Sequence, residues 1–171
     1  VLTCILTEFN LNATGSSANG NFSYSWTSNP AGGIVSGGNT LQPTINQTGN
    51  YSLTVLNEDN GCENTAQIVV NENINPPVAA ASADDQFDCV TESVSLDGSG
   101  SSVGPVFTYL WTGSGTIDNP TGLAPIVYEP GIYTILVTDL DNGCTKTADV
   151  LVGQDEDVPS VADIQVVEPA C

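Results

Sequence analysis

The stretch "GIYTILVTDLDNGC" at Gly131–Cys144 decides the fold, because a second version, "GNYSLTVLNEDNGC", occurs at Gly49–Cys62. In both versions Tyr, a branched aliphatic residue and Val occupy alternate positions. This period of two predicts a strand with one buried face. The Asn-Gly pair that follows predicts a type I′ turn, in which both central residues have positive φ. Each version therefore predicts a β-hairpin.

The repetition extends over nearly the whole chain of 171 residues. Matching cysteines and tryptophans set the spacing, which is 85 residues for Cys4/Cys89 and Trp26/Trp111 and 82 for Cys62/Cys144. Internal repetition at a fixed period indicates a tandem array. We therefore expect the chain to be a fragment of a longer array.

The domain boundaries follow from this period. Repeat 1 is predicted at 1–75, with its first strand missing or truncated, and repeat 2 at 76–158. Residues 159–171 are predicted to be a linker and the first strand of the next repeat, because Pro159–Cys171 has the same length as Pro77–Cys89.

The remaining patterns also indicate strands. The segments "FSYSW" at Phe22–Trp26 and "FTYLW" at Phe107–Trp111 alternate aromatic residues with others, as half-buried strands do. Gly, Pro, Asn and Ser separate the apolar segments, and no helical period competes. The sequence predicts an all-β protein of two tandem immunoglobulin-like sandwiches.

The charge excludes several partners. The formal net charge is −19, because 20 acidic residues face Lys146 alone. Such a chain cannot neutralise phosphates, so nucleic acid is not expected as a partner. No run of 18 apolar residues is present, so we expect no direct membrane insertion.

Three motifs in the second repeat carry a family resemblance: "LDGSGSS" at Leu96–Ser102, "FTYLW", and the hairpin stretch. In this order they resemble the PKD-like, immunoglobulin-like repeats of giant secreted surface adhesins and filament proteins of Bacteroidota. The first copy departs from the motif, with Asn12-Ala13 in place of Asp97-Gly98, so a role of that Asp would not carry over.

The resemblance implies a structural segment of a large extracellular cell-surface adhesin or filament. It would act as a stiff stalk for attachment to surfaces or other cells, with neighbouring repeats of the same chain, and other copies in a filament, as partners. The alternatives are a ligand- or calcium-dependent binding module and an accessory domain of a secreted enzyme.

The five cysteines predict disulfides in an extracellular chain. The simplest pairing is within each repeat, Cys4 with Cys62 and Cys89 with Cys144. In an immunoglobulin-like sandwich, however, these positions lie at opposite ends, about 20 Å apart, beyond the roughly 7 Å that bridged Cα atoms allow. Pairing between repeats, Cys4 with Cys144, is therefore favoured, and Cys62 would pair with a preceding repeat and Cys89 and Cys171 with following ones.

Catalysis and cofactors have little support in the residues. "GSSVG" at Gly100–Gly104 spells the Gly-x-Ser-x-Gly motif, but the chain has no His to activate the serine, so no enzyme is expected. No cofactor is required. Calcium is the open case, because carboxylates cluster in the sequence near the repeat junctions, at Asp84, Asp85, Asp155, Glu156 and Asp157.

Overall fold

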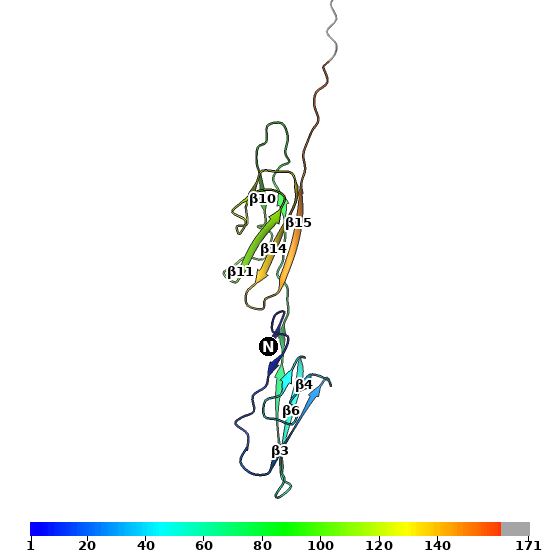
Figure 1. Cartoon of the computed structure of the whole chain (residues 1–171), viewed down its shortest axis with the longest axis vertical. Coiled ribbons are helices and arrows are strands. Elements are labelled where there is room, and N and C mark those ends of the chain that lie inside the picture. Colours follow the sequence, from blue (N-terminus) through cyan, green and yellow to red (C-terminus); the bar gives the residue numbers. More distant parts are fainter. Residues whose placement is uncertain (162–171) are drawn as a thin grey trace, which may run out of the picture. The chain divides into compact units, whose positions relative to one another are not determined.

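The computed structural model describes residues 1–161, and every regular element in that part of the chain is a β-strand (Figure 1). The strands of the first copy are β1 (Leu2–Thr3), β2 (Phe9–Asn10), β3 (Phe22–Asn29), β4 (Ile34–Ser36), β5 (Thr44–Ile45), β6 (Gly49–Asn57), β7 (Glu63–Val70) and β8 (Glu72–Asn73). Those of the second copy are β9 (Ser82–Ala83), β10 (Val94–Asp97), β11 (Phe107–Gly113), β12 (Ile117–Asp118), β13 (Ile126–Val127), β14 (Gly131–Asp139) and β15 (Thr145–Val152). Across the described part no helix is long and apolar enough to span a bilayer.

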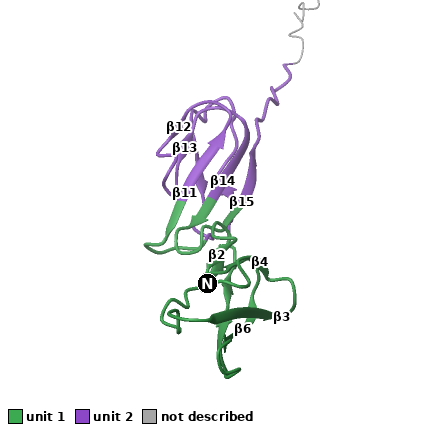
Figure 2. Ribbon diagram, turned by 60° about the horizontal axis from the view of Figure 1, so that its bottom comes forward, with its two compact units in different colours: residues 1–78, 102–108, 137–146 green, residues 79–101, 109–136, 147–171 purple. Residues whose placement is uncertain are grey.

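The chain forms two compact units that do not coincide with the two sequence copies (Figure 2). Unit 1 contains residues 1–78 together with two loops of the second copy, 102–108 and 137–146. Unit 2 contains 79–101, 109–136 and the chain from Thr147 onward. The predicted repeat boundaries describe the period of the sequence and stay a prediction.

The first copy forms two three-stranded sheets and one parallel strand pair. Antiparallel strands β3, β6 and β7 make one sheet, β2, β5 and β4 the other, and β1 pairs with β8. The β6–β7 pairing runs without interruption from Gly49↔Val70 to Leu56↔Glu63. The hairpin predicted for "GNYSLTVLNEDNGC" is thus confirmed.

The core of unit 1 is formed by the inward-facing side chains, which alternate along its strands. In β3 the aromatic residues Phe22, Tyr24 and Trp26 are half-buried, as is Ser28 further along the same face, and the residues that alternate with them are exposed. Trp26 packs against a cluster of buried residues: Leu2, Leu11, Ile45, Tyr51 and Val70. The period of two therefore placed the aromatic face correctly.

The second copy repeats this arrangement. Strands β11, β14 and β15 form one sheet, and β12, β13, β10 and β9 form the other. Its most deeply buried side chains include Trp111, Leu96, Tyr133 and Ile135. Two sheets with apolar inner faces in each copy define tandem immunoglobulin-like β-sandwiches, as the sequence predicted.

Equivalent hydrogen bonds, as well as equivalent strands, occur within each of the two copies. The indole N–H of Trp26 donates to the carbonyl of Thr40 at 2.9 Å, and that of Trp111 donates to the carbonyl of Gly122 at 3.0 Å. Likewise the backbone N–H of Leu11 donates to Pro43, and that of Leu96 donates to Pro125, both at 2.9 Å. The sequence period is therefore also a period of backbone geometry, and residues of the two copies can be compared one by one.

Strand β9 of the second copy has no counterpart among the described residues of the first. Strand β9 pairs antiparallel with β10, through Leu96↔Ala83 and Asp97↔Ser82, so β10 lies between β9 and β13. Strand β2 is the equivalent of β10, but within residues 1–161 it pairs with β5 alone.

The turn between β6 and β7 differs from the prediction. Asn57 and Cys62 close a four-residue loop, since the N–H of Asn57 donates to the carbonyl of Cys62 and the N–H of Gly61 donates to that of Asn57. Only Gly61 has positive φ, at 71°, and Asn60 does not. The type I′ prediction was wrong, because a loop of this length needs one left-handed residue, and the asparagine serves through its side chain instead.

Candidate functional site: a disulfide junction inside unit 1

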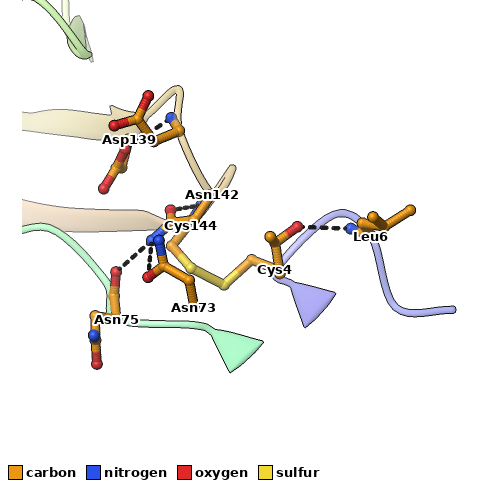
Figure 3. The surroundings of a disulfide bond; sticks show 9 residues. Cys4, Leu6, Asn73, Asn75, Asp139, Asn142 and Cys144 are labelled. Atoms are coloured by element: carbon orange, nitrogen blue, oxygen red, sulfur yellow. Dashed lines mark hydrogen bonds between the residues drawn. A yellow bond between two sulfur atoms is a disulfide. The ribbon is translucent and has the colours of Figure 1, made fainter. Parts of the chain in front are cut away.

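A disulfide joins the two sequence copies (Figure 3). It links Cys4 of the first copy to Cys144 of the second, with an S–S distance of 2.02 Å and a Cα–Cα distance of 5.1 Å. The two cysteines are 140 residues apart in sequence, and both belong to unit 1. This is the pairing that sandwich topology favoured.

Pairing within each copy does not occur: Cys62 and Cys89 are free and exposed. The reason is visible in unit 1. Strand β7 leads away from Cys62, and Glu72, ten residues further along, pairs with Leu2 at the start of the chain. Ten extended residues span about 30 Å, so Cys4 and Cys62 lie at opposite ends of this strand. The alternative pairing of Cys4 with Cys62 and Cys89 with Cys144 was therefore wrong.

A buried asparagine organises the polar groups around the disulfide. The backbone carbonyl of Asn142 accepts from the N–H of Cys4 (3.1 Å), and its Oδ1 accepts from the N–H of Cys144 (2.8 Å). Its Nδ2 donates to Oδ1 of Asn73 (3.1 Å) and to the carbonyl of Asn75 (3.0 Å), as Figure 3 shows. Asn142 is only 2% exposed. Asn142, through its backbone carbonyl and its side chain together, thus connects both cysteine-bearing segments to the end of β8.

A glycine lets the first segment approach the loop closely. Gly143 has φ of 69°, and a Cβ atom there would lie 2.5 Å from the side chain of Ile5. Ile5 itself belongs to a tight turn in which Leu6 donates to Oγ1 of Thr3 (2.9 Å) and Thr3 donates back to Leu6 (3.0 Å). Because glycine combines positive φ with the absence of a Cβ, this position tolerates no other residue without a shift.

The first copy contains the same Asn-Gly-Cys loop, at Asn60–Cys62, but there the loop is exposed. Oδ1 of Asn60 accepts from the N–H of Cys62 at 2.9 Å, as Asn142 does for Cys144. Gly61 has φ of 71°, and no atom lies within 4 Å of a Cβ built there. The Asn-Gly-Cys motif is therefore a preformed loop that presents a cysteine, and in the second copy a partner segment meets it. Neither the burial of Asn142 nor the contact of Ile5 had a signal in the sequence, since the two motifs are identical.

The carboxylates predicted to bind calcium do not form a cluster. Asp84 accepts a hydrogen bond from the N–H of Ser95, and Asp155 from that of Asp157. Asp85 accepts from Gln86, next to it in sequence. Among the described residues no three His, Cys, Asp or Glu side chains are grouped as metal ligands. Calcium binding through Asp84, Asp85, Asp155, Glu156 and Asp157 stays a prediction that calorimetric titration can test. The predicted bond of Cys171 to a following repeat falls outside the described residues.

The serines of "GSSVG" have structural partners. Oγ of Ser101, a buried residue, accepts from the N–H of Ala80 at 2.9 Å, and Oγ of Ser102 accepts from the N–H of Val78 at 2.9 Å. Both hydroxyls therefore hold the segment that leads into β9.

The Asp of the "LDGSGSS" motif shapes a turn. Oδ1 of Asp97 accepts from the N–H of Ser99 at 2.7 Å, and hydrogen bonds from Ser99 hold the pKa of Asp97 below its usual range. In the first copy Oδ1 of Asn12 accepts from Thr14 at 3.0 Å. The side chain of Asn12 thus accepts the equivalent backbone hydrogen bond, so this departure from the motif leaves the turn intact.

Comparisons with known proteins gave structural likenesses only. No family model and no curated protein matches the chain. A chimeric titin Z1Z2 tandem matches at 12% identity with a TM-score of 0.32, covering 79% of this chain and 84% of its own. The titin Z1Z2 domains in complex with telethonin match at 16% and 0.32, covering 86% and 88%. The four N-terminal immunoglobulin domains of a Dscam1 isoform match at 13% and 0.30, covering 86% and 41%.

The class of the protein follows from its sheets. It is an all-β chain of tandem immunoglobulin-like sandwiches, and within the described residues a disulfide joins its two sequence copies.

Proposed function

We propose that this chain is a structural segment of a large extracellular cell-surface adhesin or filament, in which it serves as a stiff stalk for attachment. The Cys4–Cys144 disulfide is the observation that carries the proposal. A disulfide persists in oxidising surroundings outside the cytosol. Its motifs resemble the PKD-like repeats of Bacteroidota surface proteins, which agrees with this role.

The junction chemistry favours stiffness. The polypeptide connects the copies once, through the Pro76-Pro77 segment, and the disulfide connects them a second time. Two covalent connections restrict rotation and bending more than one does. The hydrogen bonds of Asn142 to Asn73 and Asn75 fix the end of β8 against the disulfide loop. Proline in the connecting segment limits its freedom further.

The composition suits a long exposed stalk. A net charge of −19 keeps the chain soluble. The partners in this role are neighbouring repeats of the same chain and other copies in a filament.

The test compares inter-repeat flexibility with and without the disulfide. The Cys4→Ser variant should show a broader distribution of particle shapes by electron microscopy and small-angle scattering than the unaltered chain, because one of the two connections is lost. Cys62→Ser is the matched control, since Cys62 is free, and should leave the distribution unchanged. Equal flexibility in all three proteins would refute the stalk role.

The location needs its own measurement. Antibodies against the folded chain should label intact producing cells at their surface. Labelling only after permeabilisation would contradict the extracellular assignment.

A further inference from the structure

We propose that Asn142 is a latent modification site that the Cys4–Cys144 disulfide seals. When a small thiol reduces the bond, the side chain of Asn142 cyclises with the backbone nitrogen of Gly143, releases ammonia and becomes an aspartyl or isoaspartyl residue. Either product hinders the junction from closing again. This inference goes beyond the stalk function and does not depend on it, and all the residues it involves belong to unit 1.

The dipeptide Asn142-Gly143 contains the two groups that react. The backbone nitrogen of the residue after an asparagine can attack Cγ, the carbon of the side-chain amide. A glycine in that place has no Cβ to obstruct the approach. The sequence therefore supplies a reactive pair, and the surroundings of the pair decide whether it reacts.

Hydrogen bonds restrain both reacting groups in the intact junction. The N–H of Gly143 donates to the carbonyl of Asp139 at 2.7 Å. Nδ2 of Asn142 donates to Oδ1 of Asn73 at 3.1 Å and to the carbonyl of Asn75 at 3.0 Å. Cyclisation must break all three bonds, because the nitrogen of Gly143 gives up its proton and Nδ2 leaves as ammonia. The folded junction therefore opposes the reaction.

The segment around Cys4 covers the reactive pair. Asn142 is 2% exposed, so the water that the reaction consumes is kept away. The N–H of Cys4 donates to the carbonyl of Asn142 at 3.1 Å, and a Cβ on Gly143 would lie 2.5 Å from the side chain of Ile5. The disulfide ties this covering segment to the loop. Reduction therefore releases the segment that shields the site.

The loop of the first copy separates the local hydrogen bonds from this cover. There too the N–H of Gly61 donates to the carbonyl of Asn57, at 2.8 Å, and Oδ1 of Asn60 accepts from Cys62 at 2.9 Å. In this chain Asn60 is exposed, and no atom lies within 4 Å of a Cβ built on Gly61. Asn60-Gly61 is therefore an internal reference with the same loop but without the covering segment.

Reduction starts at Cys4, because Cys4 is exposed whereas Cys144 is 1% exposed. The thiolate of a small thiol such as glutathione attacks the sulfur of Cys4 and displaces the thiolate of Cys144. A second glutathione thiolate then attacks its partner in the mixed disulfide and releases Cys4. The protein bond gains two electrons and two protons, and the two glutathione molecules become one oxidised glutathione.

The modification itself needs only water. The nitrogen of Gly143 attacks Cγ of Asn142, a C–N bond forms, the bond from Cγ to Nδ2 breaks, and ammonia leaves with the proton from Gly143. Water then opens the succinimide ring at one of its two carbonyls, which gives an aspartyl or an isoaspartyl residue. Neither product keeps the Nδ2 donor, so the oxygens of Asn73 and Asn75 lose their partner when the junction closes.

The first test measures the rate at which the amide of Asn142 becomes an acid. Oxidised chains and chains kept reduced by glutathione are incubated at mildly alkaline pH, digested and analysed by mass spectrometry. Reduction should speed the conversion of Asn142 about tenfold or more, which corresponds to an opening free energy lower by about 1.4 kcal/mol. The rate at Asn60 should stay the same, because Cys62 is free and its loop is not tied to the bond.

Matched variants separate the bond from the reducing agent. Without any thiol present, Cys4→Ser should convert Asn142 at the rate of the reduced chain, and Cys62→Ser at the rate of the oxidised chain. Equal rates at Asn142 with and without the bond would overturn the proposal. An equal acceleration at Asn60 would overturn it too, because the protection would then belong to the whole fold and not to the junction.

The second test asks whether a converted junction closes again. It uses a chain that carries Cys62→Ser, Cys89→Ser and Cys171→Ser, so that the two junction cysteines can pair only with each other. After reduction and incubation, the chain is equilibrated with a fixed ratio of oxidised to reduced glutathione. Non-reducing mass spectrometry should find the Cys4–Cys144 bond less often in converted chains than in unconverted ones. Equal fractions would overturn the claim that the modification keeps the junction open.

Discussion

At the residue scale, identical motifs acquire different roles from their surroundings. Asn142 and Asn60 both accept the N–H of the following cysteine, but only Asn142 is buried and also donates to two oxygens. A buried amide that loses a partner costs more than an exposed one, because water replaces the partner only at the surface. Matched substitutions in the two copies therefore separate the contribution of the local turn to stability from the contribution of the contacts at the disulfide junction.

We expect Asn142→Asp to lower the free energy of unfolding by about 1–3 kcal/mol. The new carboxylate oxygen would face the acceptor oxygens of Asn73 and Asn75, and the bond from Cys144 would remain. Asn60→Asp is the control and should change stability little, since Asn60 is exposed. Chemical denaturation of both variants at neutral pH provides the measurement, and equal losses would contradict the role of the Nδ2 atom.

Gly143→Ala should destabilise the protein more than Gly61→Ala. Both positions have positive φ, so both substitutions carry a backbone cost of about 1 kcal/mol. Only at Gly143 would the Cβ also collide with Ile5. Thermal unfolding of the two variants measures the difference, and a rescue of Gly143→Ala by Ile5→Ala would identify the collision as the cause. Equal melting temperatures would mean that the Ile5 segment moves aside freely.

At the element scale, short polar turns set where the strands end. The turn after β10 depends on Asp97, which accepts from Ser99, and the corresponding turn after β2 depends on Asn12. The same turn geometry thus contains a titratable side chain, Asp97, in one copy and a non-titratable one, Asn12, in the other.

Asp97 should titrate below the ordinary range of an aspartate, because hydrogen bonds from Ser99 favour its charged form. A lowered pKa in the folded state means that this contribution to stability is complete above the unfolded-state pKa and is lost as the pH falls through the folded-state pKa. Carboxyl NMR signals followed against pH measure it. Ser99→Ala should move the midpoint upward, and an unchanged midpoint would contradict the assigned cause.

The sequence predicted strands better than loops and sites. Alternation reports which residues share a face, so the sheets containing β3 and β6 followed from Phe22–Trp26 and the hairpin stretch. It says nothing about loop length, and the turn at Asn60-Gly61 was therefore misassigned. Asp84 and Asp85 each accept a backbone N–H, from Ser95 and Gln86, and calcium binding by these carboxylates stays a prediction. The Cys4–Cys144 pairing could be predicted from the sequence, because the predicted strands indicate at which end of a sandwich each cysteine lies.

At the scale of the whole molecule, the disulfide encloses most of the chain. It closes a loop of 140 residues, which the chain-entropy model values at about 5 kcal/mol relative to the reduced unfolded chain. Mild reduction should lower the thermal unfolding midpoint, and Cys62→Ser should not, because its thiol is free. An unchanged midpoint after verified reduction would mean that the unfolded chain gains no freedom from losing the bond.

The same loop decides how the molecule carries tension. A pull on its two ends passes from Cys4 straight to Cys144 across the sulfur bridge, so the residues between them bear no load. With 3.3–3.6 Å per extended residue, the bridge withholds roughly 460 to 500 Å of extension. Optical-tweezer traces should show that length released only after reduction. Under force the oxidised chain therefore carries the load through the sulfur bridge and through strand β15, which lies between Cys144 and the C-terminal end, while the residues between the two cysteines are shielded from extension.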